Sequence, residues 1–332
     1  MTTVLHALNS GLRRCLESSS AVYLLGEDIL DPYGGAFKVV NGLSTDFPDR
    51  VVTTPVSEAG IVGVSVGMAL RGLRPVIEIM FGDFLTLAAD QLINHAAKFR
   101  WMSNDQVRVP IVVRTPMGGY RGYGPTHSQT LEKHFLGVPG LRVVAANSLV
   151  NPEDVLCQAV LEDDDPVLFI EHKLLYPQEL FSPGDEFALE QTSGGYPWTI
   201  LRIAGAPRVD MTLAAYGYMA EVGREAQIIL AYEHEIFAEM VVPTQLTPFR
   251  LDPLLDSASK TRKVLTVEEG TLNLGWSAEV AAQILESLGA ETRFRRVAAQ
   301  NLPIPAAATL ETAVLPNVDD IVESALALAK TK

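Results

Sequence analysis

Short apolar runs alternate with segments of helical period along the first half of the chain. The runs are continuous in hydrophobic residues, which is typical of strands buried on both faces of a parallel sheet. They span residues 21–26, 75–80, 110–114, 141–145 and 166–171, and the helical segments between them span 57–71, 86–102 and 152–163. This alternation predicts an α/β domain built on a parallel sheet.

The alternation of apolar runs and helical segments stops between residues 174 and 207 and then resumes. The intervening stretch is rich in Pro and Gly and has no sustained period, so it is predicted to be a linker. Strands are predicted beyond it at 211–217, 237–242, 264–269 and 292–297, and helices at 220–232 and 275–288. The predicted organisation is a domain at 1–173, a linker at 174–207 and a second, smaller α/β domain at 208–332.

Composition narrows the class of protein. The 332 residues carry a formal net charge of −14, which disfavours nucleic acid and anionic membranes as partners because both attract clustered Lys and Arg. Cys15 and Cys157 provide no disulfide framework or cysteine metal site. The N-terminal segment has the pattern of an amphipathic helix rather than a secretory signal, and no apolar run is long enough for a transmembrane helix. Together these features predict a cytoplasmic protein.

A carboxylate stands at the start of the predicted helix at 57–71. Ser57 is a suitable N-cap, and Glu58 falls in the first turn, where the helix dipole favours an anion. Taken alone, this arrangement is typical of a capping carboxylate. A catalytic role would require an apolar pocket and a ligand that shares a proton with Glu58.

Three glycines, Gly60, Gly63 and Gly67, fall on one face of the same helix. Each destabilises a helix interior by about 1 kcal/mol relative to Ala, so the spacing indicates close approach of another backbone. That backbone belongs either to the sheet of the same domain or to another subunit. Residues 63–67 also match the GxSxG pattern of a hydrolase, but Ser65 would lie inside a helix rather than at a strand-to-helix turn.

The glycine-rich segment GGYRGYGPTHSQ at 118–129 follows a predicted strand. Loops at the carboxyl ends of parallel strands line the ligand crevice of such sheets. His127 lies in this loop, where it is either an exposed histidine or a group that handles protons. The acidic run at 162–165 is predicted to be a solvated turn. The sequence has no Walker loop, HExxH motif or cysteine cluster.

These motifs together resemble a known family. The segments LLGEDI, YGGAFKV, TTPVSEAGIVGVSVGMALRGLRPVIEIMFGDF, DQLINHAAKFRWMS, VPIVVRTPMGG, THSQ and DDDPVLFIEHK are similar to the β subunit of the thiamine-diphosphate-dependent decarboxylating component of 2-oxo acid dehydrogenase complexes. Pyruvate, branched-chain 2-oxo acid and acetoin dehydrogenases have such a subunit. The resemblance implies two parallel-sheet α/β domains, a transketolase-like pyrimidine-binding domain and a transketolase C-terminal domain.

The resemblance also implies roles for particular residues. Glu58 matches the glutamate that shares a proton with N1′ of the aminopyrimidine ring, which activates the cofactor. Phe84 matches the aromatic residue that lies against this ring, and Val56 falls in the same cofactor-binding segment. His127 matches the histidine associated with acyl transfer to a lipoyl group. In this interpretation the GxSxG match is accidental, and the glycine face contacts a partner subunit.

Metal ions and partners follow from the same resemblance. Some members bind a structural K⁺ through main-chain oxygens, at positions that match Ile111, Val160, Leu161, Asp163 and Asp165. The Gly-Asp-Gly segment that helps to hold Mg²⁺ and the diphosphate has no match in this chain. An α subunit is therefore expected to supply that site in an α2β2 heterotetramer, with a lipoyl acyltransferase as a further partner and a small 2-oxo acid as substrate.

The chain departs from the family pattern in ways that leave the substrate and acceptor open. Thr126 precedes His127 where many bacterial members have two histidines, and the segment VVPTQLTPF replaces a usual Asp-Leu-Arg. The linker is unusual, and the strand that ends at Glu268 and Glu269 lacks a common histidine. Alternatives are an acetoin dehydrogenase or carboligase β subunit and, in another class, a β-like scaffold protein without turnover.

Overall fold

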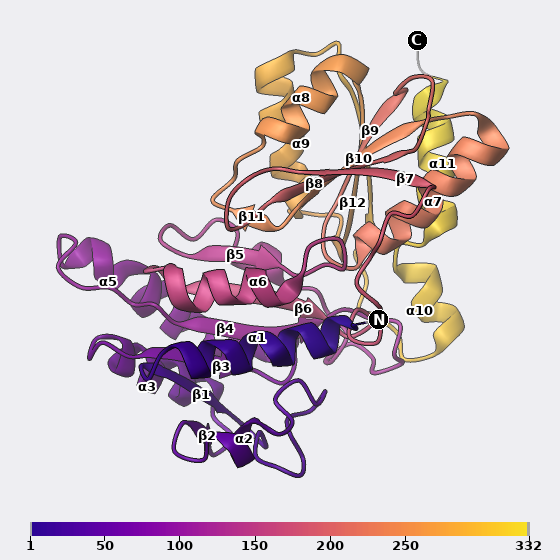
Figure 1. Ribbon diagram of the computed structural model, residues 1–332. Helices are drawn as coiled ribbons and strands as arrows, with labels where there is room; N and C mark the ends of the chain where they lie inside the picture. Colours follow the sequence, from indigo (N-terminus) through magenta and orange to yellow (C-terminus); the bar gives the residue numbers. More distant parts are fainter. Residues whose placement is uncertain (1, 331–332) are drawn as a thin grey trace. The chain divides into compact units, whose positions relative to one another are not determined.

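The computed structural model describes residues 2–330, which form two compact units (Figure 1). The first unit contains residues up to 118, then 134–180 and 246–248, and the second contains 119–133, 181–245 and the residues from 249 onward. The predicted α/β class with two domains is confirmed. The boundaries differ from the prediction, because the chain leaves the first unit at 119–133 and returns to it at 246–248.

The first unit is built on a seven-stranded sheet with the order β11-β5-β6-β4-β3-β1-β2. Five of these strands match the predicted apolar runs, and their core positions are almost entirely buried, as expected for a sheet covered on both faces. The pairs β1–β2, β1–β3, β3–β4, β4–β6 and β5–β6 are all parallel. The strands are β1 (Val22–Gly26), β2 (Val51–Thr53), β3 (Arg74–Glu78), β4 (Val112–Met117), β5 (Arg142–Ala145), β6 (Val167–His172) and β11 (Gln245–Thr247).

The three predicted helices of this unit are present, and two of them contain a π-helical turn. The helical elements are α1 (Val4–Ser18), α2 (Leu43–Asp46), α3 (Glu58–Ala69), η1 (Gly82–Phe84), α4 (Leu85–Asp90), η2 (Gln91–Ala96), α5 (Ala97–Met102), α6 (Pro152–Cys157) and η4 (Gln158–Glu162). The short η3 (Glu132–His134) is divided between the two units. The segments η2 and η4 are the π-helical ones. None of the helices in residues 2–330 is both long and apolar enough to cross a membrane.

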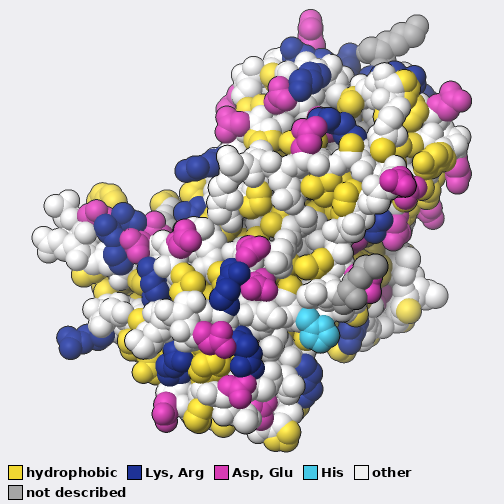
Figure 2. All heavy atoms as spheres, in the orientation of Figure 1, with side chains coloured by type: hydrophobic (Ala, Val, Ile, Leu, Met, Phe, Trp, Pro, Cys, Tyr) yellow, Lys and Arg dark blue, Asp and Glu magenta, His cyan; other side chains and the backbone are white. Residues whose placement is uncertain are grey.

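Helix α1 packs through the apolar face that its sequence pattern predicts. Its buried residues recur every three or four positions, which places them on one face, and that face packs against α6. At the rim of this contact, Arg14 forms ion pairs with Glu153 and Asp154. Figure 2 shows positive and negative side chains interspersed over this region rather than gathered into a basic patch.

The second unit has a six-stranded sheet with the order β13-β12-β9-β10-β8-β7. Strands β9, β10, β12 and β13 pair in parallel, whereas β8 is antiparallel to both β10 and β7. The strands are β7 (Phe187–Gln191), β8 (Trp198–Ile203), β9 (Met211–Ala215), β10 (Ala238–Pro243), β12 (Lys263–Thr271) and β13 (Arg293–Ala299). The helices are α7 (Met219–His234), α8 (Asp252–Thr261), α9 (Trp276–Leu288), α10 (Ala308–Val314) and α11 (Val318–Ala329).

The main difference from the predicted organisation lies at 174–207. This stretch was expected to be a linker, but β7 and β8 form a hairpin at the edge of the second sheet, which makes that sheet mixed rather than purely parallel. In the outermost strand, β7, only Phe187 is buried, and the strand ends in two polar residues, Glu190 and Gln191. An edge strand needs only one apolar face, so its hydrophobic signal is weak. The surrounding Pro and Gly belong to the turns that flank the two strands.

Candidate active site

The carboxyl ends of the first sheet position the predicted carboxylate. Glu58 is the first residue of α3, which follows β2, and only 6% of its surface is exposed. The side-chain oxygen of Ser57 accepts a hydrogen bond from the backbone N–H of Gly60 at 3.3 Å, so Ser57 caps the helix as predicted. Glu58 is therefore a buried carboxylate at a helix N-terminus, where the dipole favours its charged form.

A second carboxylate that sequence reasoning missed lies beside Glu58. Glu27 directly follows β1 and is 4% exposed, and its Oε1 accepts a hydrogen bond from the backbone N–H of Ser57 at 3.2 Å. Burial and the nearby charge of Glu58 raise the pKa of Glu27. Within residues 2–330 the structure shows no ion pair to either carboxylate. A signal was available in the sequence, since an acidic residue ends the apolar run at 21–26.

Phe84 and Val56 lie in the same unit as Glu58. Phe84 ends η1, and its ring packs edge-on against Phe81 with the centroids 5.7 Å apart. The ammonium of Lys173 lies 5.3 Å from the centroid of Phe81, which fixes this aromatic cluster from the other side. Val56 precedes the N-cap of α3 and is 78% exposed. The structure thus provides a held aromatic residue at the end of η1 and an exposed apolar residue two positions before Glu58.

A different pair of carboxylates in this unit is clamped by an arginine. Arg114 donates to both oxygens of Glu171, at 2.7 and 2.9 Å, and to Glu78 at 3.1 Å. The hydroxyl of Tyr176 donates to Glu171 at 2.7 Å. All four side chains are buried, and Arg114 is 1% exposed. This network joins β3, β4 and β6 through Glu78, Arg114 and Glu171.

Helix α3 turns its glycines away from its own sheet. The buried face consists of Ile61, Val62, Ser65, Val66 and Ala69, whereas Gly60, Gly67 and Val64 are exposed. The structure therefore excludes the interpretation that the glycine face packs on the sheet of the same domain. Ser65 lies mid-helix, is fully buried, and donates its hydroxyl to the carbonyl of Ile61 at 2.8 Å. It does not form a nucleophile elbow, so the GxSxG match is accidental.

The glycine-rich loop and His127 belong to the second unit. The loop follows β4, but a carboxylate oxygen of Glu269 accepts the backbone N–H of Gly119 at 2.7 Å, and Glu311 accepts that of Tyr120 at 2.8 Å. His127 is half-buried, and its Nδ1 shares a hydrogen bond of 3.0 Å with the hydroxyl of Thr126. Glu269 and Glu311 were not predicted to position this loop, since they lie more than a hundred residues away in sequence.

Next to this loop, the buried carboxyl group of Glu132 has a raised pKa. Burial raises its pKa to about 7, and the charges of Glu268 and Glu269 act in the same direction. Tyr216 donates a hydrogen bond to one of its oxygens, and Glu268 accepts the backbone N–H groups of Trp276 and Ser277 at the start of α9. Sequence reasoning offered no signal for Glu132, because its neighbours come from β9 and β12.

The five residues proposed for a potassium site meet at one end of the first unit. Val160 and Leu161 lie in η4, Asp163 and Asp165 follow it, and the carbonyl of Ile111 accepts the backbone N–H of Val167 at 2.9 Å. The carbonyls of Val160 and Asp163 both accept hydrogen bonds from Arg74. The run at 162–165 lies in a turn whose Glu162 and Asp164 are exposed, as predicted, and its three aspartates also form ion pairs, which the sequence did not predict.

Comparisons with known proteins identify the two units. The family model for the transketolase pyrimidine-binding domain matches residues 1–179, and that for the transketolase C-terminal domain matches residues 204–321. The chain is 36% identical over 330 residues to pyruvate dehydrogenase E1 component subunit beta-2, mitochondrial, from Oryza sativa subsp. japonica, with 97% of this chain and 85% of that protein covered. The chain belongs to the transketolase-like E1 β-subunit family.

Other relatives of this E1 β chain extend the comparison. It is 33% identical to the acetoin:2,6-dichlorophenolindophenol oxidoreductase subunit beta of Cupriavidus necator, over 96% of this chain and 95% of that one. A solved structure described as a split gene transketolase, inactive beta4 tetramer, superposes with a TM-score of 0.75 over 99% of this chain and 100% of that one, at 19% identity. The latter supports the fold alone.

The residues of the first unit fit the pyrimidine half of thiamine diphosphate. A buried carboxylate in the first turn of a helix, a second carboxylate with a raised pKa and a held aromatic ring are the groups that can hydrogen-bond to a ring nitrogen and cover its face. By contrast, residues 2–330 hold no group of three or more His, Cys, Asp or Glu side chains arranged for a metal ion.

Proposed function

We propose that this chain is the β subunit of the decarboxylating component of a thiamine-diphosphate-dependent 2-oxo acid dehydrogenase, active together with an α subunit. The observation that carries the proposal is Glu58, which is buried at the N-terminus of α3 inside the segment that matches the pyrimidine-binding domain. The relatives with pyruvate dehydrogenase E1 names support this reaction class.

The role of each residue follows from its surroundings. Thiamine diphosphate, when bound, supplies the carbon that adds to the 2-oxo group and accepts electrons as carbon dioxide leaves. Glu58 would hold a proton at N1′ of the aminopyrimidine, and burial keeps water from competing for that proton. Glu27, with its raised pKa, favours a state in which this carboxylate pair retains one proton. Phe84 would cover the face of the ring.

The assignment is tested by Glu58→Gln, which keeps the size of the side chain and removes the ionisable group. With the α subunit co-expressed, decarboxylation should fall by about 10²–10⁴-fold while the unfolding midpoint stays near that of the wild type. Ser65→Ala in the same helix is the matched control and should retain activity. If Glu58→Gln turns over at the wild-type rate, the chain is better explained as a scaffold without catalysis.

The α partner is proposed to supply Mg²⁺ and the diphosphate site and to form an α2β2 heterotetramer. The exposed glycine face of α3 supports this partner, because a Cβ added at Gly67 would meet no atom of this chain within 4 Å. Gly67→Leu should leave the isolated chain folded but lower the amount of α chain that co-purifies with it. Calorimetry on the isolated wild-type chain should detect no saturable binding of thiamine diphosphate and Mg²⁺.

His127 is proposed to act in acyl transfer to a lipoyl group on an acyltransferase partner. It is half-buried in a loop, its Nδ1 shares a hydrogen bond with the hydroxyl of Thr126, and an imidazole can both accept and donate a proton near neutral pH. His127→Ala should lower the activity of the whole complex by at least tenfold more than it lowers decarboxylation measured with an artificial electron acceptor. Equal losses in the two assays would contradict this division. A cytoplasmic location remains a prediction from the sequence.

A second candidate reaction is acetoin cleavage, and the similarity to the Cupriavidus necator subunit is the observation that favours it. The same carboxylate and aromatic residue would serve either reaction, since both need an activated thiamine diphosphate. Assays of the αβ complex with pyruvate, branched-chain 2-oxo acids and acetoin, each with an artificial electron acceptor, decide between them by the ratio of kcat/KM values.

A further inference from the structure

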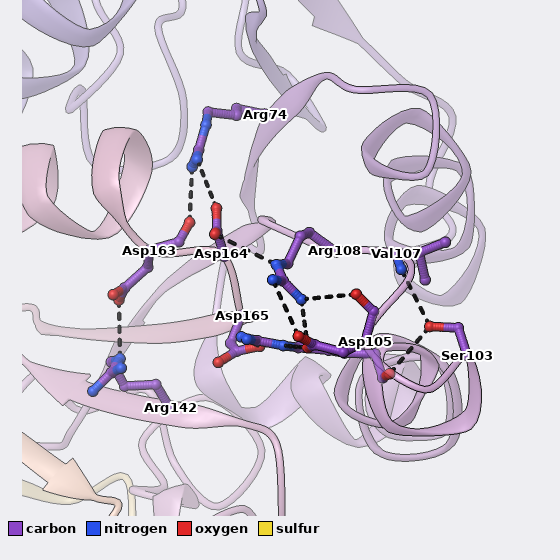
Figure 3. Close-up of polar contacts among 10 residues, drawn as sticks. Arg74, Ser103, Asp105, Val107, Arg108, Arg142, Asp163, Asp164 and Asp165 are labelled. Atoms are coloured by element: carbon purple, nitrogen blue, oxygen red, sulfur yellow. Dashed lines mark hydrogen bonds and ion pairs between the residues drawn. The ribbon is translucent and has the colours of Figure 1, made fainter.

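The turn formed by residues 160–165, named the acidic turn here, binds the side chain of Arg74. Nη1 of Arg74 donates to the main-chain carbonyl of Val160 at 3.0 Å and to that of Asp163 at 2.8 Å. Both oxygens therefore converge on a single nitrogen, as carbonyl oxygens converge on a bound K⁺. Figure 3 shows the Arg74 side chain directed at Asp163 and Asp164.

The local backbone explains why a cation is needed at this point. Val160 belongs to η4, and Asp163 caps its C-terminal end, where helix carbonyls lack intrahelical partners and carry partial negative charge. Three consecutive aspartates, 163–165, add to this negative potential. An arginine can hydrogen-bond the final carbonyls of a helix and offset that charge. Arg74 is the first residue of β3, so a strand of the sheet fixes its position.

The aspartate carboxylates of the acidic turn are also paired with arginines. The carboxylate of Asp163 pairs with Arg142 at 2.9 Å, and that of Asp165 pairs with Arg100 at 2.8 Å. Arg108 bridges Asp164 and Asp105 in the same cluster. Four arginines thus face four aspartates, and the formal charge of the cluster is zero. A K⁺ ion would add a positive charge at a point that a guanidinium nitrogen already fills.

We propose that Arg74 serves as the fixed cation of the acidic turn and that this chain folds without a structural K⁺. Three of the five residues that match the family's potassium positions do not fit the ion here, because the carbonyls of Val160 and Asp163 accept hydrogen bonds from Arg74 and the carboxylate of Asp165 pairs with Arg100. The five donors of a guanidinium suit this role, since one group can hold two carbonyls while another of its nitrogens, Nη2, pairs with Asp164 at 3.2 Å.

The first test compares salts on the full-length wild-type chain. After K⁺ is removed by dialysis, Tm is measured in KCl, NaCl and tetramethylammonium chloride at equal ionic strength. The three midpoints should agree within about 1 °C. A midpoint that rises selectively with K⁺, and saturates as the K⁺ concentration increases, would overturn the proposal because it would reveal a bound ion.

The second test removes the guanidinium of Arg74 from the place where K⁺ would bind. Arg74→Met keeps most of the side-chain stem and removes the charge, so its Tm should fall in Na⁺ and recover selectively in K⁺ by about 2–4 °C. Arg108→Met is the matched control, because Arg108 contacts aspartates of the same cluster but neither converging carbonyl. It should lose the same stability in all three salts. An Arg74→Met midpoint that does not respond to K⁺ would also overturn the proposal.

A third variant keeps the test decisive if Arg74→Met does not fold. Arg74→Lys retains a positive charge on a side chain of similar length, so it should fold and show no selective response to K⁺. If Arg74→Lys instead becomes more stable in K⁺ than in Na⁺, a charge at this position is not what excludes the ion, and the proposal fails.

Discussion

Two pairs of buried carboxylates in the first unit differ in one respect, the presence of a cation. Glu78 and Glu171 share Arg114, which donates to both of them in the interior of the sheet. Glu27 and Glu58 are equally buried, but within residues 2–330 neither has an ion-pair partner. The first pair is satisfied and joins three strands. Burial raises the pKa of one carboxyl in each pair, Glu78 in the first and Glu27 in the second, but only in the first pair does a cation, Arg114, oppose the shift.

The presence of a cation distinguishes a carboxylate pair that stabilises the fold from a pair that is suited to proton transfer. Removing one partner of a buried, hydrogen-bonded ion pair costs stability, because it leaves an uncompensated buried charge. Carboxylates buried near each other without a cation have perturbed protonation, which is the property that proton-transfer chemistry needs. The comparison therefore assigns stability to the Arg114 network and supports the cofactor-activating role proposed for Glu58. Three substitutions test it.

The largest effect is expected when Arg114 is removed. Arg114→Met would leave Glu78 and Glu171 buried without a cation, which makes the structural pair resemble the functional one. The free energy of unfolding should fall by about 3–5 kcal/mol, measured by denaturant titration. Arg13→Met is the control, because Arg13 pairs with Asp46 on the exposed surface and should cost less than about 1 kcal/mol. If the two variants lose equal free energy of unfolding, the Arg114 network does not have the stabilising role assigned to it.

Glu132 extends the comparison to a buried carboxylate in the second unit. Its folded pKa of about 7 lies above the ordinary value of 4.5, so the folded state binds its proton more tightly than the unfolded state does. The stabilisation is complete below about pH 4.5 and is lost as the pH rises to about 7 and beyond, which amounts to about 3 kcal/mol.

Glu132→Gln should remove this contribution to the pH dependence. Relative to the wild type, the variant should gain stability between pH 5 and pH 8, because Gln stays neutral in the same position. Denaturant titrations of both proteins at several pH values measure the difference. If the two stability curves run parallel across this range, Glu132 does not titrate with a raised pKa.

The smallest effect is expected at Glu27. Glu27→Gln removes one of the two adjacent charges, and the raised pKa means that the wild-type penalty grows as the pH rises. Tm should therefore increase by roughly 2 °C at pH 8 and change little at pH 4. The activity of the αβ complex should shift its pH optimum, since Glu58 would lose its charged neighbour. An unchanged pH profile would count against coupling between the two carboxylates.

The local pattern of apolar and capping residues in the sequence predicted much of the fold. The continuous apolar runs predicted the central strands of both sheets, and Ser57 with Glu58 predicted the start of α3. The hairpin of β7 and β8 was missed, because an edge strand with one buried face has little hydrophobic signal. Residues 119–133 were placed in the first domain, because nothing near them reveals that Glu269 and Glu311 hold them in the second unit.

The sequence by itself determined the order of helices and strands, the buried faces and the place of Glu58 at a helix N-terminus. These properties depend on residues within a few positions of one another, so they appear as periodicity and capping patterns. Only the tertiary structure decided which charges meet. Glu27 reaches the start of α3 across 30 residues, Arg114 reaches Glu171 across 57, and Arg74 reaches the carbonyl of Asp163 across 89. Those contacts depend on the strand order β6-β4-β3-β1, which brings distant segments side by side and leaves no trace in local sequence.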